Sequence, residues 1–233
     1  MLVSHRKKFI YTKTAKTAGT SVELFFEPYC LPANSISHSH ERGTYVGESG
    51  IVGYRGRNSF GHKWFNHMPA YRIKQLLGEE VWEEYFKFCV IRNPFDRLVS
   101  AFYHCERVRA EPLRLDNLRR KWRFGKVRVQ GTTEIERFRS WLAAGGDMND
   151  RDKYLIDGKV CVDYFIRYDS LSEGVQDVCT RLGISYDPER LPRLKSGLRN
   201  NVIPLEDYYD AKSIELVRSR YALEIEMFGF GLD

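Results

Sequence analysis

The chain has 233 residues, of which 42% are hydrophobic and 29% are charged, and its formal net charge is +6. This composition is typical of a globular domain and excludes a disordered or collagen-like chain. No apolar run reaches the roughly 18 residues of a membrane-spanning helix. Five cysteines without a CxxC pair predict neither a disulfide framework nor a zinc site, and they favour a reducing compartment.

The positive charge is concentrated in one stretch. Residues 105–130 contain nine Lys or Arg and three acids, whereas the rest of the chain is balanced. With Trp122 and Phe124 among its cations, this stretch is suited to binding nucleic acid or another polyanion. The alternative is a solvated helix face, and the sequence leaves both open.

The first part of the chain predicts a strand, a loop and a helix. Residues 8–12 form a short β-rich run, small residues follow, and Thr20 to Glu23 have the T-x-x-E form of a capping box. Residues 28–61 lack an apolar period and are expected to form a long surface excursion. A helix is predicted over residues 69–77, with a Pro in its first turn and Gly78 after its end.

The second part of the chain predicts further alternation of strands and helices. Residues 86–91 are nearly all apolar, like a strand buried on both faces of a parallel sheet. Asn93 and Pro94 then suit the N-cap and first position of a helix over residues 94–104. The remaining predicted elements are a helix at 133–142, a strand at 164–168 and helices at 171–182 and 213–228.

This order predicts an α/β fold, namely a three-layer, P-loop-like domain with a central parallel sheet flanked by helices. We expect a single domain over residues 1–233. Residues 28–61 and 105–130 are expected to be loops or insertions that contact substrate.

The loop before the first predicted helix is suited to binding an anion. Its backbone N–H groups and the positive end of the helix would face the ligand. Lys16 would add a cation, Gly19 would allow close approach, and Thr20 and Ser21 would supply hydroxyl groups. The loop lacks the G-x-x-x-x-G-K-[ST] pattern, which disfavours an ATPase or kinase. Alternatively, Thr20 only caps a helix and Lys16 is solvated.

A second candidate anion site follows the strand at residues 86–91. Arg92 stands at the end of this strand, and Arg97 and Ser100 are three residues apart on the next predicted helix. Arg92 and Ser100 can therefore meet on one anion. Two such sites at the ends of strands in one parallel sheet imply a ligand with two phosphates.

These two motifs resemble those of the 3′-phosphoadenosine 5′-phosphosulfate (PAPS)-dependent sulfotransferases, especially the carbohydrate branch that includes heparan sulfate 2-O-sulfotransferases. Residues 16–21, K-T-A-G-T-S, resemble the 5′-phosphosulfate loop of that family. Residues 92–100 match the R-N-P-x-x-R-x-x-S part of its R-N-P-x-x-R-x-x-S-x-Y motif at every position, and Tyr103 stands one position later than the tyrosine of that motif. The resemblance continues weakly through residues 164–182 and 221–230 and does not include residues 28–60 and 105–130.

The resemblance implies in-line transfer of a sulfuryl group from PAPS to a hydroxyl or amine, with adenosine 3′,5′-bisphosphate as product and no metal. It places Lys16 on the bridging oxygen that leaves with the phosphate. The residues that would bind the two phosphate ends of the donor are Lys16, Thr17, Ala18, Gly19, Thr20, Ser21, Arg92, Arg97 and Ser100.

The resemblance also places a histidine base between the two motifs, and His62 and His67 are the candidates. We favour His67, because it precedes a predicted helix start whose dipole disfavours the imidazolium ion. Both histidines are alternatively polar loop residues, and Glu41 and Glu48 are alternative bases. His38 and His40 offer too few ligands to predict a metal site.

The acceptor is expected to be a carbohydrate or glycoconjugate, although a lipid-linked sugar, a phenol or a peptide tyrosine stays open. Residues of the basic stretch that would contact it are Arg119, Arg120, Trp122 and Arg123. Rival hypotheses are a kinase-like P-loop protein and a non-catalytic module that binds polyanions or nucleic acid. Lys16 lies too near Met1 for an anchor and stem, so we expect a cytoplasmic, bacterial-type enzyme; the alternative is a catalytic fragment of a Golgi-lumenal enzyme.

Overall fold

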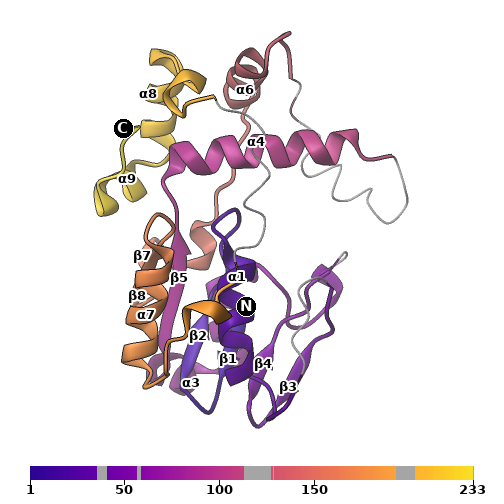
Figure 1. Cartoon of the computed structure of the whole chain (residues 1–233), viewed down its shortest axis with the longest axis vertical. Coiled ribbons are helices and arrows are strands. Elements are labelled where there is room, and N and C mark those ends of the chain that lie inside the picture. The colour runs from indigo at the N-terminus through magenta and orange to yellow at the C-terminus, as the bar shows by residue number, and fades with distance from the viewer. Residues whose placement is uncertain (36–40, 57–58, 113–126, 128, 193–202, 233) are drawn as a thin grey trace. The chain divides into compact units, whose positions relative to one another are not determined.

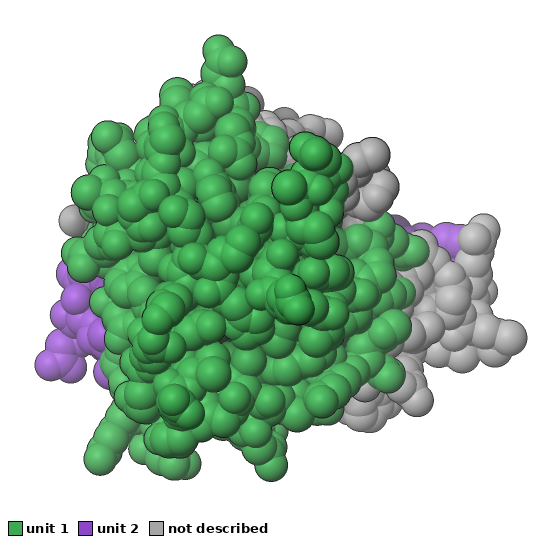
Figure 2. Space-filling view, turned by 90° about the horizontal axis from the view of Figure 1, so that it is seen from below, with its two compact units in different colours: residues 1–91, 150–195 green, residues 92–149, 196–233 purple. Residues whose placement is uncertain are grey.

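The structure is a computed structural model and describes residues 1–35, 41–56, 59–112, 127, 129–192 and 203–232. It divides into two compact units (Figures 1 and 2). Residues 1–91 and 150–195 form the sheet unit, and residues 92–149 and 196–233 form the helical unit. Each unit is described by itself.

The sheet unit contains a six-stranded mixed sheet with strand order β3-β4-β1-β2-β5-β8. The strands β2, β5 and β8 are parallel, as predicted, whereas β1, β3 and β4 pair in antiparallel fashion. The expectation of a parallel central sheet is therefore correct for only half of it. The strands are β1 (Leu2–Ser4), β2 (Phe9–Tyr11), β3 (Tyr45–Gly47), β4 (Gly50–Val52), β5 (Phe86–Ile91) and β8 (Tyr164–Arg167).

The prediction of a surface excursion over residues 28–61 is wrong, because this segment supplies two strands of the sheet. All three residues of β4 are buried, and β4 pairs with both β1 and β3. Strands of three residues are too short to show the alternation by which a strand is recognised in a sequence. A separate short hairpin is formed by β6 (Leu155–Ile156) and β7 (Lys159–Val160).

Helices cover both faces of this sheet, so the sheet unit has three layers (Figure 1). On one face Leu2 and Phe9 pack with α1 (Gly19–Phe26) and α7 (Leu171–Arg181). On the other face Val3 and Ile10 pack with α2 (Ala70–Leu77) and α3 (Glu79–Glu84). Because neighbouring strand residues point to opposite faces, each central strand contributes to both apolar cores. The predicted helices at 69–77 and 171–182 are confirmed.

The helical unit is built on α4 (Pro94–Ala110), α6 (Glu134–Ala143), α8 (Ala211–Arg220) and α9 (Ala222–Phe228). As predicted, Asn93 caps α4 by accepting a hydrogen bond from the Phe95 amide, but the helix continues six residues beyond the expected end. Thr133 and Glu136 form a capping box at the start of α6. The single helix expected over residues 213–228 is interrupted at Tyr221, whose backbone leaves the helical region and whose ring is buried.

Two parts of the sequence hypotheses lie outside the described residues. These are the acceptor-contacting residues Arg119, Arg120, Trp122 and Arg123, and the histidine pair His38 and His40. Within the described part of the chain, no helix is long and apolar enough to cross a membrane.

Candidate functional site

The loop between β2 and α1 is fixed to the carboxyl end of the parallel strands. The Thr12 amide donates to the Phe88 carbonyl at 3.0 Å, and the Thr14 hydroxyl donates to the Val90 carbonyl at 2.6 Å. On its other side the Ala15 amide donates to Asp150 Oδ2 at 2.5 Å. Residues from two distant parts of the sequence therefore hold this loop in place.

The loop presents a group of backbone donors. Lys16 and Ala18 adopt left-handed φ angles of 63° and 55°, and Ala18 is the N-cap of α1 without a side-chain cap. Among the described residues, no protein atom accepts a hydrogen bond from the amides of Thr17, Ala18, Gly19 and Thr20. Consecutive free N–H groups at a helix N-terminus form a binding site for an anion.

The predicted T-x-x-E capping box is wrong, since Ala18 rather than Thr20 precedes the helix. Thr20 lies in the first turn, and its Oγ1 is 3.3 Å from Lys13 Nζ. Glu23 does not reach back to the helix end, because its carboxylate is fully buried among cations.

These cations form a charge cluster beneath the loop. Glu23 Oε2 lies 2.6 Å from Lys13 Nζ and 2.8 Å from Arg55 Nη1, and Oε1 lies 2.8 Å from Arg42 Nη2. Burial alone would raise the pKa of Glu23, but the cations outweigh it and hold this pKa well below its ordinary value. Burial also lowers the pKa of Lys13, to about 8, although Glu23 opposes the change.

His67 belongs to the same site. Its Nδ1 lies 3.0 Å from the carbonyl oxygen of Lys13. A carbonyl oxygen only accepts, so Nδ1 carries the proton and Nε2 keeps its lone pair. Burial and then the charge of Lys13 lower the pKa of His67 to about 3, so the ring is a neutral base near neutral pH.

The other candidate bases have different surroundings. His62 is exposed, and its ring stacks on Tyr54 with centroids 3.7 Å apart. Glu41 and Glu48 are exposed as well. Among the described residues, His67 forms a hydrogen bond to the loop, and no such bond is found for His62.

Two residues of this site escaped the sequence analysis. Lys13 directly follows the first predicted strand, and its position before the small-residue loop was a signal that we did not use. Asp150 is only 5% exposed and lies 135 residues from its partner Ala15. Its surroundings in the sequence contain no motif that indicates this contact.

The second motif lies in the helical unit. Arg92 is 9% exposed, and its Nε donates to Asp96 Oδ2 at 2.5 Å. Ser100 is partly exposed on α4. Arg97 is only 1% exposed, and its guanidinium lies 5.7 Å from the centre of the Tyr221 ring.

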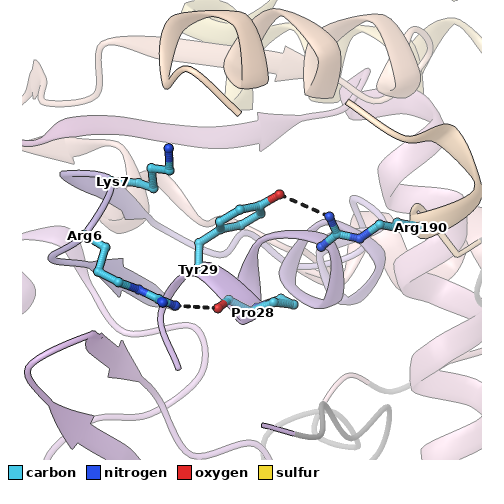
Figure 3. A pocket seen from close by; sticks show the side chains of 5 residues that line it. All are labelled: Arg6, Lys7, Pro28, Tyr29 and Arg190. Atoms are coloured by element: carbon cyan, nitrogen blue, oxygen red, sulfur yellow. Dashed lines mark hydrogen bonds between the residues drawn. The ribbon is translucent and has the colours of Figure 1, made fainter. Parts of the chain in front are cut away.

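The sheet unit also contains a hollow of about 320 Å³ at the other end of α1 (Figure 3). It is lined by Arg6, Lys7, Pro28, Tyr29 and Arg190. Arg6 Nη2 donates to the Pro28 carbonyl at 2.8 Å, and Lys7 Nζ donates to the Gly183 carbonyl at 3.1 Å. Pro28 and Gly183 lie two residues beyond the ends of α1 and α7. Cations close to the negative ends of helices are stabilising, which gives this hollow a structural explanation.

The described residues contain no group of three or more His, Cys, Asp or Glu side chains arranged to hold a metal ion. Searches of curated proteins and of solved structures returned no match. A family model described as "Sulfotransferase family" matches residues 1–231, which include both motifs and parts of both units. The chain therefore belongs to the sulfotransferase family.

Proposed function

We propose that the protein transfers a sulfuryl group from PAPS to a hydroxyl or amine of an acceptor. Membership of the sulfotransferase family supplies the reaction class. The observation that carries the proposal is one loop that combines Lys16, a contact to a neutral histidine and four backbone N–H groups that have no acceptor among the described residues. Such a site can bind the phosphosulfate and accept a proton beside it.

In this proposal the two motifs bind the two phosphate ends of one donor. The loop of residues 16–21 binds the 5′-phosphosulfate, and Arg92 and Ser100 bind the 3′-phosphate. The Asp96 carboxylate orients the Arg92 guanidinium. Arg97 supports this end of α4 through its packing on Tyr221. The whole chain then acts as one P-loop-like sulfotransferase domain.

The chemical step is an in-line displacement at sulfur. The acceptor oxygen forms a bond to sulfur while the bond from sulfur to the bridging oxygen breaks. The acceptor proton moves to Nε2 of His67, and the electron pair of the broken bond stays on the phosphate oxygen. The Lys16 ammonium and the loop amides stabilise the charge that develops there, so the proposed step uses no metal.

The resemblance to the carbohydrate branch supports a glycan or glycoconjugate as acceptor, and this branch is consistent with the family found. The basic residues Arg119, Arg120 and Arg123 would then contact an anionic or sugar acceptor, with Trp122 stacking on a ring. A cytoplasmic location is part of the same proposal.

The proposal predicts micromolar binding of adenosine 3′,5′-bisphosphate in the absence of magnesium, measured by calorimetry. An Arg92→Met variant should lose at least tenfold in affinity, because a charge-assisted contact to the 3′-phosphate is removed. Lys7→Met is the matched control, since it removes a cation at the other end of α1 and should leave the affinity unchanged.

Radiolabelled PAPS and four acceptors, a polysaccharide, a lipid-linked sugar, a phenol and a tyrosine peptide, then define the acceptor class. Binding of ATP with magnesium alone, or of RNA alone, would contradict the proposal and support one of its rivals.

A further inference from the structure

Lys13 lies directly beneath the phosphosulfate loop. Its side chain is almost fully buried, with 3% of the residue exposed. A Cβ atom at Gly19 would stand 3.0 Å from Cγ and 3.1 Å from Cε of Lys13. The loop backbone therefore rests on the aliphatic part of this lysine, and glycine at position 19 permits that contact.

The ammonium of Lys13 determines the direction of a hydrogen bond at Thr20. Lys13 Nζ is 2.6 Å from Glu23 Oε2 and 3.3 Å from Thr20 Oγ1. An ammonium group only donates, so the Thr20 oxygen accepts this hydrogen bond. The hydroxyl proton of Thr20 is then available for another acceptor. Thr20 is partly exposed beside the free loop amides, where an anion would accept it.

The carbonyl of the same residue determines the direction of a second hydrogen bond. It accepts from Nδ1 of His67, which leaves Nε2 as the acceptor of the ring. The left-handed backbone of His67, with φ of 55°, brings the ring to this carbonyl. One residue therefore contacts both a candidate donor to the phosphosulfate and the candidate base.

We propose that Lys13 is a positioning residue that fixes the hydrogen-bond polarity of both groups, making Thr20 a donor and Nε2 of His67 an acceptor. This inference rests on the proposed sulfuryl transfer for its catalytic meaning. Lys13 touches neither substrate nor the reacting atoms, and in this it differs from Lys16.

Removal of the Lys13 ammonium is compatible with folding. In a Lys13→Met variant the thioether side chain can fill the same space under Gly19. Glu23 keeps Arg42 and Arg55 at 2.8 Å, so its buried carboxylate stays paired. Thermal unfolding and the far-ultraviolet circular dichroism spectrum show whether the variant retains its fold.

The first test reads the tautomer of His67 without any ligand. In ¹⁵N-histidine NMR spectra of the wild-type protein, His67 should be the Nδ1-protonated tautomer and stay neutral at pH 6. Lys13, Lys153 and the Met1 amine face the ring and disfavour its charge, whereas Glu23 favours it. An Nε2-protonated ring, or an imidazolium ion at pH 6, would overturn the inference. This result does not depend on sulfuryl transfer.

The second test is a double-mutant cycle of Lys13→Met with Thr20→Val. Each single variant should lower kcat/KM for PAPS about 10- to 100-fold, the cost of a charge-assisted hydrogen bond. The kcat/KM of the double variant should be no lower than that of the less active single variant, because Lys13 acts through Thr20. Lys13→Met combined with Ser21→Ala is the control, for which the two losses should multiply.

Multiplying losses in the Thr20 cycle, or a Lys13→Met variant within twofold of the wild type, would refute the role of the ammonium. If the wild-type protein does not transfer sulfate from PAPS at all, the proposed function fails. The tautomer of His67 then still tests whether the Lys13 carbonyl makes Nε2 the acceptor of the ring.

Discussion

A Lys16→Met variant is expected to lower kcat for sulfuryl transfer about 10²- to 10³-fold, the usual cost of removing one donor to a developing oxyanion. The Lys16 charge is needed most when negative charge gathers on the leaving phosphate oxygen. Binding of adenosine 3′,5′-bisphosphate should weaken far less, because the loop amides and Arg92 remain. Single-turnover transfer from radiolabelled PAPS measures the chemical step directly.

The matched control for Lys16 is Lys74→Met, which removes a partly exposed lysine paired with Glu79 and Glu83 on the surface. Its kcat should equal that of the wild type. A Lys16→Met enzyme that keeps more than a third of the wild-type kcat would show that this residue does not stabilise the leaving group.

A His67→Asn variant is expected to lower kcat about 10²- to 10⁴-fold, as the loss of a general base does. Asparagine tolerates the left-handed backbone of this position, so the loop contacts should persist. The pH profile is equally informative. Because the pKa of His67 is lowered to about 3, kcat/KM of the wild type should not fall as the pH is lowered from 7 to 5. A decline with a midpoint near 6.5 would show that another group is the base.

The lowered pKa of His67 also predicts how the stability of the protein depends on pH. The folded-state pKa of His67 is about 3, below the ordinary value of 6.5, so between these values the unfolded chain binds the extra proton. Stability contributed by the neutral ring is present above pH 6.5 and decreases as the pH falls towards 3. Between pH 7.5 and pH 5, urea unfolding should therefore show a smaller loss of unfolding free energy for His67→Asn than for the wild type. Equal losses in the two proteins would contradict the lowered pKa of His67.

Local patterns predicted those parts of the fold that depend on neighbours in the sequence. The apolar run of β5 and the Asn-Pro start of α4 are such patterns, and both are confirmed. The strands β1, β3 and β4 were missed because three residues do not establish a period. Their place in the sheet follows from pairing between segments as far apart as Leu2 and Val52.

The candidate site divides in the same way. Residues 16–21 and 92–103 are contiguous motifs, so the sequence alone indicated an anion site in each. The contacts of Lys13 with His67 and of Ala15 with Asp150 join residues 54 and 135 positions apart. Such contacts depend on the complete fold, and no local pattern specifies them. The T-x-x-E pattern predicted a capping box that does not form, because the buried cations around Glu23 bind its carboxylate more strongly than a helix end would.

The fixation of the loop by Thr14 and Ala15 has a consequence for how the proposed donor would associate. A segment already held in its binding conformation loses little conformational entropy when the anion arrives. The favourable free energy of nucleotide binding is then not reduced by the entropic cost of ordering the loop. Association should therefore proceed in a single kinetic phase, and its rate should rise linearly with nucleotide concentration in stopped-flow measurements.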